Sequence, residues 1–163
     1  EREAADLVID TTELTLADLR TVLERRFAPG AGHELTVSVV SFAYGRGLPR
    51  EADLVFDVRF LENPHYVEGL RQGTGLDQAV ADYIAKDPAF PKFFGTLVDM
   101  LDGLMPQYDE EGKSYLTIAF GCTGGRHRSV FSAERLAEHL RDQGRRGFVR
   151  HRELGTPADA DPT

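Results

Sequence analysis

The hydrophobic pattern of the chain predicts four short β-strands. Residues 35–42 are rich in β-branched side chains, which favour the pleated backbone of a strand. Residues 53–60 form a nearly continuous apolar run, as expected for a strand that is covered on both faces. Residues 115–120 predict a third strand, and residues 148–149 predict a last, very short one.

Between these strands, apolar residues recur every three or four positions, which is the spacing of amphipathic helices. The spacing covers residues 16–27, 77–86, 88–108 and 130–140. Gly144 follows the last of them and is expected to end it, because glycine is the usual residue just beyond a helix C-terminus.

Alternation of strands and helices predicts an α/β fold, a three-layer αβα arrangement around a mainly parallel sheet. In such sheets, ligands bind beyond the carboxyl ends of the strands. The glycine-bearing loops that follow residues 35–42 and 115–120 are expected at that edge. An irregular stretch from residue 63 to residue 75 is expected there too, and loops of that length are often functional.

Composition limits the class of protein. The chain has 163 residues, 41% apolar and 28% charged, which suits one globular domain. It has no apolar run long enough for a membrane span and no cysteine–histidine spacing typical of zinc, so we expect neither a membrane segment nor a structural metal. Its single cysteine, Cys122, excludes an internal disulfide and favours a reducing compartment, the cytoplasm.

The charge of the chain is unevenly distributed. The net charge is −8, which argues against a general polyanion binder, yet residues 126–152 hold eight arginines and only three acidic residues. A local basic face suits a defined anion or one contact with nucleic acid, and an ordinary solvated helix face explains it equally well. The candidate RNA-contacting residues are Arg141, Arg145, Arg146, Arg150 and Arg152.

The segment Gly121 to Ser129 carries the clearest chemistry. An apolar strand, a glycine loop and a helix start follow one another there, an order that directs backbone N–H groups and the helix dipole at an anion. Gly124 and Gly125 allow the backbone to curl, and Arg128 can hold phosphate oxygens through two nitrogens. We therefore predict a phosphate site formed by Cys122, Thr123, Gly124, Gly125, Arg126, His127, Arg128 and Ser129.

The same loop has the spacing of cysteine-dependent phosphatases. Five residues separate Cys122 from Arg128, and Ser129 follows. In those enzymes a thiolate attacks phosphorus, the arginine holds the oxygens and the hydroxyl supports the thiolate. The reaction also needs a general acid, for which Asp57 is the candidate. The alternative is that Cys122 is only a small buried side chain.

Two further positions are candidates for contact with the rest of a ligand. His65, in the Asn63-Pro64-His65 loop, could donate to a phosphate or to a sugar hydroxyl, or it could be a surface histidine. Asp57 lies in an apolar run, where a carboxylate needs a partner, and Arg59 would share its face. A ligand role and a structural role remain open for this pair.

Taken together, these motifs resemble the C-terminal domain of the RapZ/YvcJ family of bacterial nucleotide-binding proteins. The resemblance extends over residues 7–153. It rests on residues 47–53 (GLPREAD), 57–61 (DVRFL), 63–66 (NPHY), 74–77 (TGLD), 113–119 (KSYLTIA) and 121–130 (GCTGGRHRSV).

The resemblance implies a fold similar to a sugar-phosphate subdomain of phosphofructokinase. It also implies a sensor of glucosamine-6-phosphate, with the 122–129 loop and Asn63 to His65 forming the pocket. Other implied partners are a small regulatory RNA, an endoribonuclease and further copies of the chain. ATP or GTP would bind in a separate domain, because no Walker sequence occurs here, and this domain itself would need no cofactor and perform no catalysis.

Family members that bind RNA end in a basic tail, which residues 155–163 lack, so RNA binding is a weaker expectation. The chain begins without methionine. We expect residues 1–12 to be the end of an upstream domain or a linker, residues 13–154 to form the ligand-binding domain, and residues 155–163 to be a disordered tail.

Overall fold

A computed structural model describes residues 35–154 and six isolated positions before them. Those positions are Ile9, Thr11, Thr12, Leu14, Leu19 and Leu23. The chain divides into two compact units, Glu1–His33 and Glu34–Thr163, and the strands and helices named below belong to the second. Apart from the isolated positions, the helix expected at 16–27, the segment 1–12 and the tail 155–163 lie outside the described residues.

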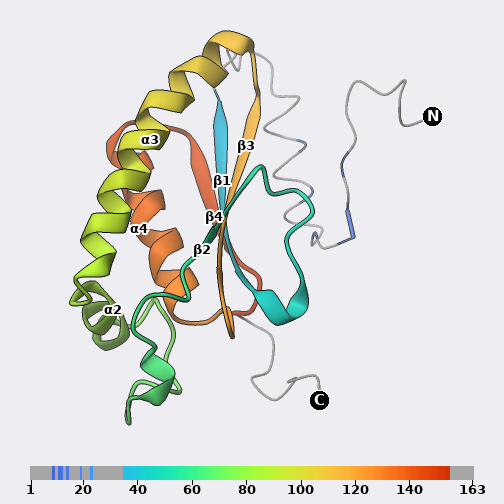
Figure 1. Ribbon diagram of the computed structural model, residues 1–163. Coiled ribbons are helices and arrows are strands. Elements are labelled where there is room, and N and C mark those ends of the chain that lie inside the picture. The colour runs from blue at the N-terminus through green and yellow to red at the C-terminus, as the bar shows by residue number, and fades with distance from the viewer. Residues whose placement is uncertain are drawn as a thin grey trace. The chain divides into compact units, whose positions relative to one another are not determined.

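A four-stranded sheet forms the centre of the second unit (Figure 1). Its strands are β1 (Thr36–Ala43), β2 (Leu54–Asp57), β3 (Tyr115–Cys122) and β4 (Gly147–His151). They lie in the order β2-β3-β1-β4, and every pairing is parallel. The predicted α/β fold with a mainly parallel sheet is therefore confirmed.

Strand β2 is shorter than the predicted 53–60. It ends at Asp57, and the apolar pattern continues after the chain has left the regular ladder. The backbone nitrogen of Val58 still bonds to the carbonyl of Gly121, and Val58 is fully buried. Phe60 is 53% exposed, and its ring forms a T-shaped pair with that of Phe93 at a centroid distance of 5.2 Å.

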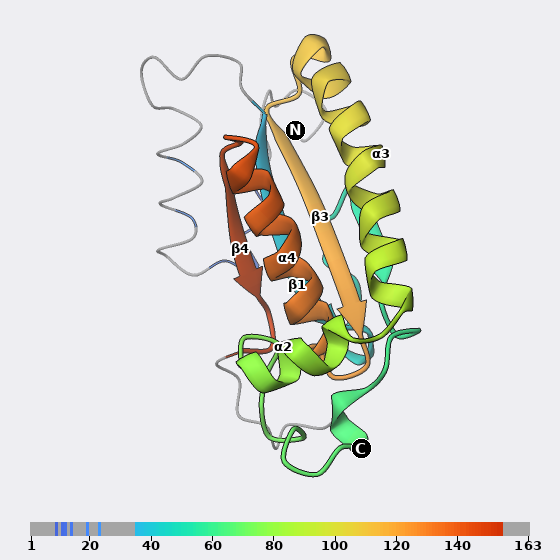
Figure 2. The same cartoon turned by 90° about the vertical axis from the view of Figure 1, so that its left-hand side faces the viewer.

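Three helices cover one face of the sheet (Figures 1 and 2). They are α2 (Gln78–Ala85), α3 (Ala89–Glu111) and α4 (Arg128–Asp142), all close to their predicted bounds. Helix α4 packs on β1, β3 and β4, and its buried stripe includes Val130, Leu136 and Leu140. None of the described helices has the length and apolar character needed to cross a membrane.

A smaller apolar cluster covers the other face of the sheet. Val40, Phe42 and Ala119 form it, with Tyr44 and Ala52 from the connection between β1 and β2 packed against them. This connection begins with the 3-10 turn η2 (Tyr44–Arg46). A parallel sheet flanked by helices, with side chains buried on both faces, is consistent with the predicted αβα architecture.

Parallel pairing brings the carboxyl ends of all four strands to the same edge of the sheet, the lower edge in Figure 1. The strands end there at Ala43, Asp57, Cys122 and His151. The predicted phosphate loop follows Cys122 directly, so the fold places it at the edge where ligands of α/β proteins bind.

Candidate functional site

The predicted phosphate loop joins the end of β3 to the start of α4. Cys122 is the last residue of the strand and Arg128 the first of the helix, as the glycine-loop pattern predicts. Gly125 has a φ of 66°, in the left-handed region that favours glycine. A side chain there would also lie 2.6 Å from Glu153 Cγ and 2.8 Å from the Ala43 nitrogen. Only glycine therefore fits at this curl of the loop.

Arg128 is held deep in the site, with 4% of its surface exposed. Its Nη1 donates to the carbonyl oxygens of Arg59 at 2.7 Å and Leu61 at 3.1 Å. Its Nη2 lies 3.4 Å from Thr123 Oγ1 in the loop. Its Nε is the one buried side-chain nitrogen or oxygen that lacks a hydrogen-bond partner in the described part of the chain. Nη1 of the guanidinium is thus anchored and Nη2 has a long contact with Thr123, while Nε lacks an acceptor.

Cys122 lies at the base of the loop and is 2% exposed. Its Sγ is 3.1 Å from the Oγ of Ser129, which is fully buried on the first turn of α4. The structure thus brings together the thiol and the hydroxyl that the spacing singled out, and the Arg128 guanidinium reaches the same loop at Thr123. The geometry accommodates both readings of Cys122, as a nucleophile and as a small buried side chain.

The stretch from residue 63 to residue 75 lies beside the loop and is irregular, as predicted. Its turn η3 (Pro64–Tyr66) begins where Asn63 Oδ1 accepts from the His65 nitrogen at 3.2 Å. The carbonyl of His65 accepts from Arg71 Nε at 3.0 Å. The nitrogen of Gly75 donates to the Arg126 carbonyl at 2.8 Å. These contacts hold the Asn63–His65 turn next to the phosphate loop.

His127 connects this stretch to the loop. Its Nε2 lies 3.2 Å from the carbonyl oxygen of Arg71, and the side chain is almost fully buried. Burial is the main reason why the pKa of His127 lies below its usual value, and the charges of Arg126 and His65 lower it further. Arg71 links the two histidine residues, because its Nε donates to the His65 carbonyl and its own carbonyl oxygen lies 3.2 Å from His127 Nε2.

Asp57 and Arg59 form an ion pair at the end of β2. Arg59 Nε lies 3.0 Å from both carboxylate oxygens, and its Nη2 donates to Oδ2 at 2.6 Å. The guanidinium also stacks on the Tyr44 ring at 4.1 Å. These hydrogen bonds hold the pKa of Asp57 below its usual range, with help from the charge of Arg128. Asp57 is thus ionised and already partnered, and it is exposed rather than buried.

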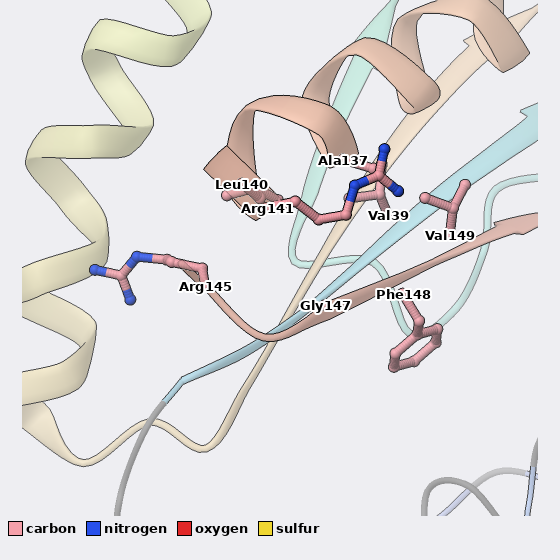
Figure 3. Close-up of a pocket in the computed structure, with 8 residues that line it drawn as sticks. All are labelled: Val39, Ala137, Leu140, Arg141, Arg145, Gly147, Phe148 and Val149. Atoms are coloured by element: carbon pink, nitrogen blue, oxygen red, sulfur yellow. The ribbon is translucent and has the colours of Figure 1, made fainter. Parts of the chain in front are cut away.

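The five arginines expected to contact RNA divide between the two ends of β4. At its start, Arg145 pairs with Asp109 at 2.8 Å, and with Arg141 it lines a hollow of about 50 Å³ between α4 and β4. Figure 3 shows the two guanidinium groups pointing in different directions. Arg146 is exposed nearby.

At the other end, Arg150 pairs with Glu51. Arg152 donates to the carbonyls of Gly47 at 3.0 Å and Arg46 at 3.3 Å. The run of arginines in the sequence is therefore not one continuous basic face, and Arg145, Arg150 and Arg152 have the internal partners just named.

Sequence reasoning missed two groups near the site. Glu153 is 6% exposed and lies against Gly125. Ser41 Oγ lies 2.9 Å from His151 Nδ1, and His151 Nε2 lies 2.9 Å from Glu134 Oε1, which joins β1, β4 and α4. No local pattern marks these residues, since their partners are up to 110 positions away.

Comparison with known proteins agrees with this architecture. Residues 35–155 match the model of the family described as the RapZ C-terminal domain. The chain belongs to that family. The matched range contains the phosphate loop, the Asn63–His65 turn and the arginines around β4.

Several curated bacterial proteins are similar over almost the whole chain. A nucleotide-binding protein of Rhodospirillum centenum is 57% identical over 153 residues, which cover 94% of this chain and 46% of the relative. A nucleotide-binding protein of Rhodospirillum rubrum is 56% identical, covering 94% and 48%. One of Gluconobacter oxydans is 53% identical over 155 residues. The chain spans about half the length of these relatives.

Proposed function

We propose that this RapZ C-terminal domain binds a small phosphorylated sugar and acts as the metabolite-sensing part of a larger regulator. One observation carries the proposal: the buried guanidinium of Arg128 is anchored through Nη1 and keeps an Nε without a partner beside the glycine loop. A phosphate that accepts from Nε and Nη2 would satisfy this orphaned donor, and bidentate arginine–phosphate contacts are among the strong ones.

The surrounding charges favour a dianion. The N-terminus of α4 contributes partial positive charge, and Arg126 and Arg128 carry full charges, whereas burial lowers the pKa of His127 and favours its neutral form. The left-handed φ of Gly125 is of the kind found in anion-binding nests, so backbone N–H groups of this loop are the proposed donors to the phosphate. An inorganic phosphate or a phosphate monoester fits this chemistry, and the neighbouring side chains then select among monoesters.

Glucosamine-6-phosphate is the proposed ligand. His65 would donate to a sugar hydroxyl, and Asp57 would pair with the ammonium group. Because Arg59 already holds Asp57 through three hydrogen bonds, the ammonium has to share or displace that guanidinium. Once displaced from Asp57, the Arg59 guanidinium could turn toward the phosphate. Binding of the ammonium group would then release a hydrogen-bond donor for the phosphate group of the same ligand.

The test is thermal unfolding of the chain with glucosamine-6-phosphate, glucosamine, glucose-6-phosphate and inorganic phosphate. At a hundredfold excess over Kd, a ligand adds about 2.7 kcal/mol, or roughly 5–10 °C for this size. We expect that shift with the amino-sugar phosphate, and its loss in Arg128→Lys, which keeps the charge without the two-nitrogen edge. Arg135→Ala, an exposed arginine on α4, is the matched control. Equal small shifts with every phosphate would reduce the site to a general anion loop.

Asp57→Asn tests the specificity. We expect the variant to bind glucosamine-6-phosphate and glucose-6-phosphate with similar affinity, because the amide no longer attracts the ammonium. If the variant prefers the amino sugar as strongly as the wild type, the assignment of Asp57 is wrong.

The contact between Cys122 and Ser129 supports a second candidate, phosphoester hydrolysis. The thiolate would attack phosphorus, the ester P–O bond would break, and water would then cleave the S–P bond to release phosphate. The leaving oxygen needs a proton, and Asp57 is a poor donor because Arg59 keeps its pKa low. Release of nitrophenol from p-nitrophenyl phosphate by the wild type, and its absence in Cys122→Ser, would establish this activity. Nitrophenolate leaves easily without a proton, so no release by the wild type would exclude phosphoester hydrolysis even for a good leaving group.

For the whole protein we propose a nucleotide-binding regulator of the kind that its relatives' names describe, with ATP or GTP bound outside this domain. Binding of small RNA, delivery to an endoribonuclease and assembly into homo-oligomers belong to the same proposal. RNA contact is assigned to the exposed Arg141 and Arg146. Affinity for a structured RNA that falls steeply with salt, and falls again in Arg141→Ala, would support it.

A further inference from the structure

The strap, defined here as residues 150–153, crosses beneath the phosphate loop. Its last residue, Glu153, is buried, and its Oε1 accepts from the backbone nitrogen of Ala43 at 2.9 Å. The carbonyl oxygen of Glu153 lies 3.5 Å from Arg126 Nη1. Glu153 therefore contacts both the end of β1 and a side chain of the loop.

The side chain of Glu153 also supports the curl of the loop. A Cβ on Gly125 would lie 2.6 Å from Glu153 Cγ and 2.8 Å from the Ala43 nitrogen, so the Gly125 backbone rests directly on these two groups. Gly125 is the loop residue in the left-handed region. The backbone of the loop at Gly125 is thus packed closely against the side chain of Glu153.

The role of the carboxyl group follows from where β4 ends. Strand β4 pairs with β1 only as far as Ser41 and His151, and the Arg152 nitrogen adds one more bond to the Ser41 carbonyl at 3.1 Å. The next donor on that side of β1 is the Ala43 N–H, and the Glu153 side chain accepts its bond. Without this acceptor, a backbone donor would be buried unpaired at the base of the loop.

The strap itself is fixed by contacts outside the loop. Arg152 donates to the carbonyls of Gly47 and Arg46, and Arg150 pairs with Glu51. His151 is bonded to both Ser41 and Glu134. None of these contacts involves a residue of the phosphate loop, so Glu153 is supported from a side other than the loop.

We propose that Glu153 is a positioning residue of the phosphate loop: it sets the curl at Gly125 and, through Arg126, the ring of donors offered to a phosphate. The part of this inference that concerns ligand affinity rests on the proposed function. Under this assignment, Arg150 and Arg152, two of the five arginines that the sequence suggests for RNA contact, belong to the segment that supports the ligand site.

The experiment compares Glu153→Ala and Glu153→Gln in the 163-residue chain. Binding of glucosamine-6-phosphate and inorganic phosphate is measured by calorimetry, and the amide signals of Ala43, Gly124 and Gly125 by NMR without ligand. We expect Glu153→Ala to weaken binding at least tenfold and to move all three signals. Glu153→Gln keeps the length and an acceptor oxygen, and should stay within threefold of the wild type.

Two further variants separate positioning from general stability. His139→Ala removes a contact between α4 and Asp102 of α3, remote from the loop, and should lower Tm without changing affinity or the loop signals. Glu153→Asp keeps the charge but shortens the side chain by one methylene, so it should weaken binding even if Glu153→Ala fails to fold. Unchanged Gly124 and Gly125 signals in Glu153→Ala, or in Glu153→Asp if the alanine variant does not fold, would overturn the inference. Moved signals in a chain that binds neither anion would uphold the positioning role and refute the proposed function instead.

Discussion

Gly75 provides a test of how rigidly the 63–75 stretch is joined to the phosphate loop. Its φ is not in the left-handed region, so the need for glycine is purely steric. A Cβ at this position would collide with the carbonyl oxygen of His127 and the backbone nitrogen of Phe131, and would lie 2.9 Å from Val130 Cβ. All three neighbours belong to the start of α4, where the backbone cannot easily yield.

The cost of Gly75→Ala follows from these contacts. Overpacking of this kind costs about 1–3 kcal/mol. Relief by separation would break the 2.8 Å bond from the Gly75 nitrogen to the Arg126 carbonyl, a loss of about 1 kcal/mol. We therefore expect a loss of about 3 kcal/mol in the free energy of unfolding, or a fall in Tm of about 6–12 °C.

Urea unfolding of Gly75→Ala and Gly103→Ala would measure this. Gly103 is exposed within α3, and a Cβ there meets nothing within 4 Å. The same substitution should stabilise the chain by about 0.5–1 kcal/mol at that position, because alanine favours the helix. A loss below 1 kcal/mol at Gly75 would show that the stretch moves away from α4 at little cost, and would refute a rigid placement of His65.

Three other predictions follow from single contacts. Ser41→Ala should lower the free energy of unfolding by about 1–3 kcal/mol, because it removes a fully buried hydroxyl that is bonded to His151. His151 also bonds to Glu134, so the effects of Ser41→Ala and Glu134→Gln should not add in a double-mutant cycle. Additive effects would contradict coupling of the two residues through His151. Burial alone would raise the pKa of Asp109, but hydrogen bonds from Arg145 and the Leu35 nitrogen hold it below its usual value. The ionised carboxylate of Asp109 therefore stabilises the fold above about pH 4, and this stabilisation is lost as pH falls through the folded pKa. In urea unfolding, Asp109→Asn should lower the free energy of unfolding less at pH 3 than at pH 7. The pKa of His127 is lowered chiefly by burial, so stability should fall as pH drops below about 6.5, and His127→Gln should flatten that slope.

The two proposed functions of the loop, ligand sensing and phosphoester hydrolysis, require different chemistry from the same residues. Both need the Nε–Nη2 edge of Arg128, but hydrolysis also needs an acid close to the leaving oxygen. The ion pair with Arg59 keeps Asp57 ionised, which favours recognition of an ammonium over donation of a proton. Under the proposed function, a loop that binds an alkyl phosphate without protonating the leaving group would keep its ligand intact.

The elements that depend on short-range pattern were predictable from the sequence. The helical spacing of residues 130–140 corresponds to α4, and the β-branched run 35–42 corresponds to β1. The strand–glycine–helix order around Gly125 located the loop, because a helix start and a curled backbone depend on neighbours within a few positions. Alternation of strands and helices was enough to indicate the parallel sheet and the edge where the loop lies.

Tertiary structure alone decided what supports that loop. Arg128 is anchored by carbonyls 67 and 69 positions earlier, and Ala43 is bonded by Glu153, 110 positions later. The order β2-β3-β1-β4 creates these neighbours, and no local spacing encodes that order. It also separates Arg141 from Arg152, which the sequence presents as one basic run. Charge and hydrophobic pattern report what each residue offers, whereas the pairing of distant strands determines which groups are left free to bind.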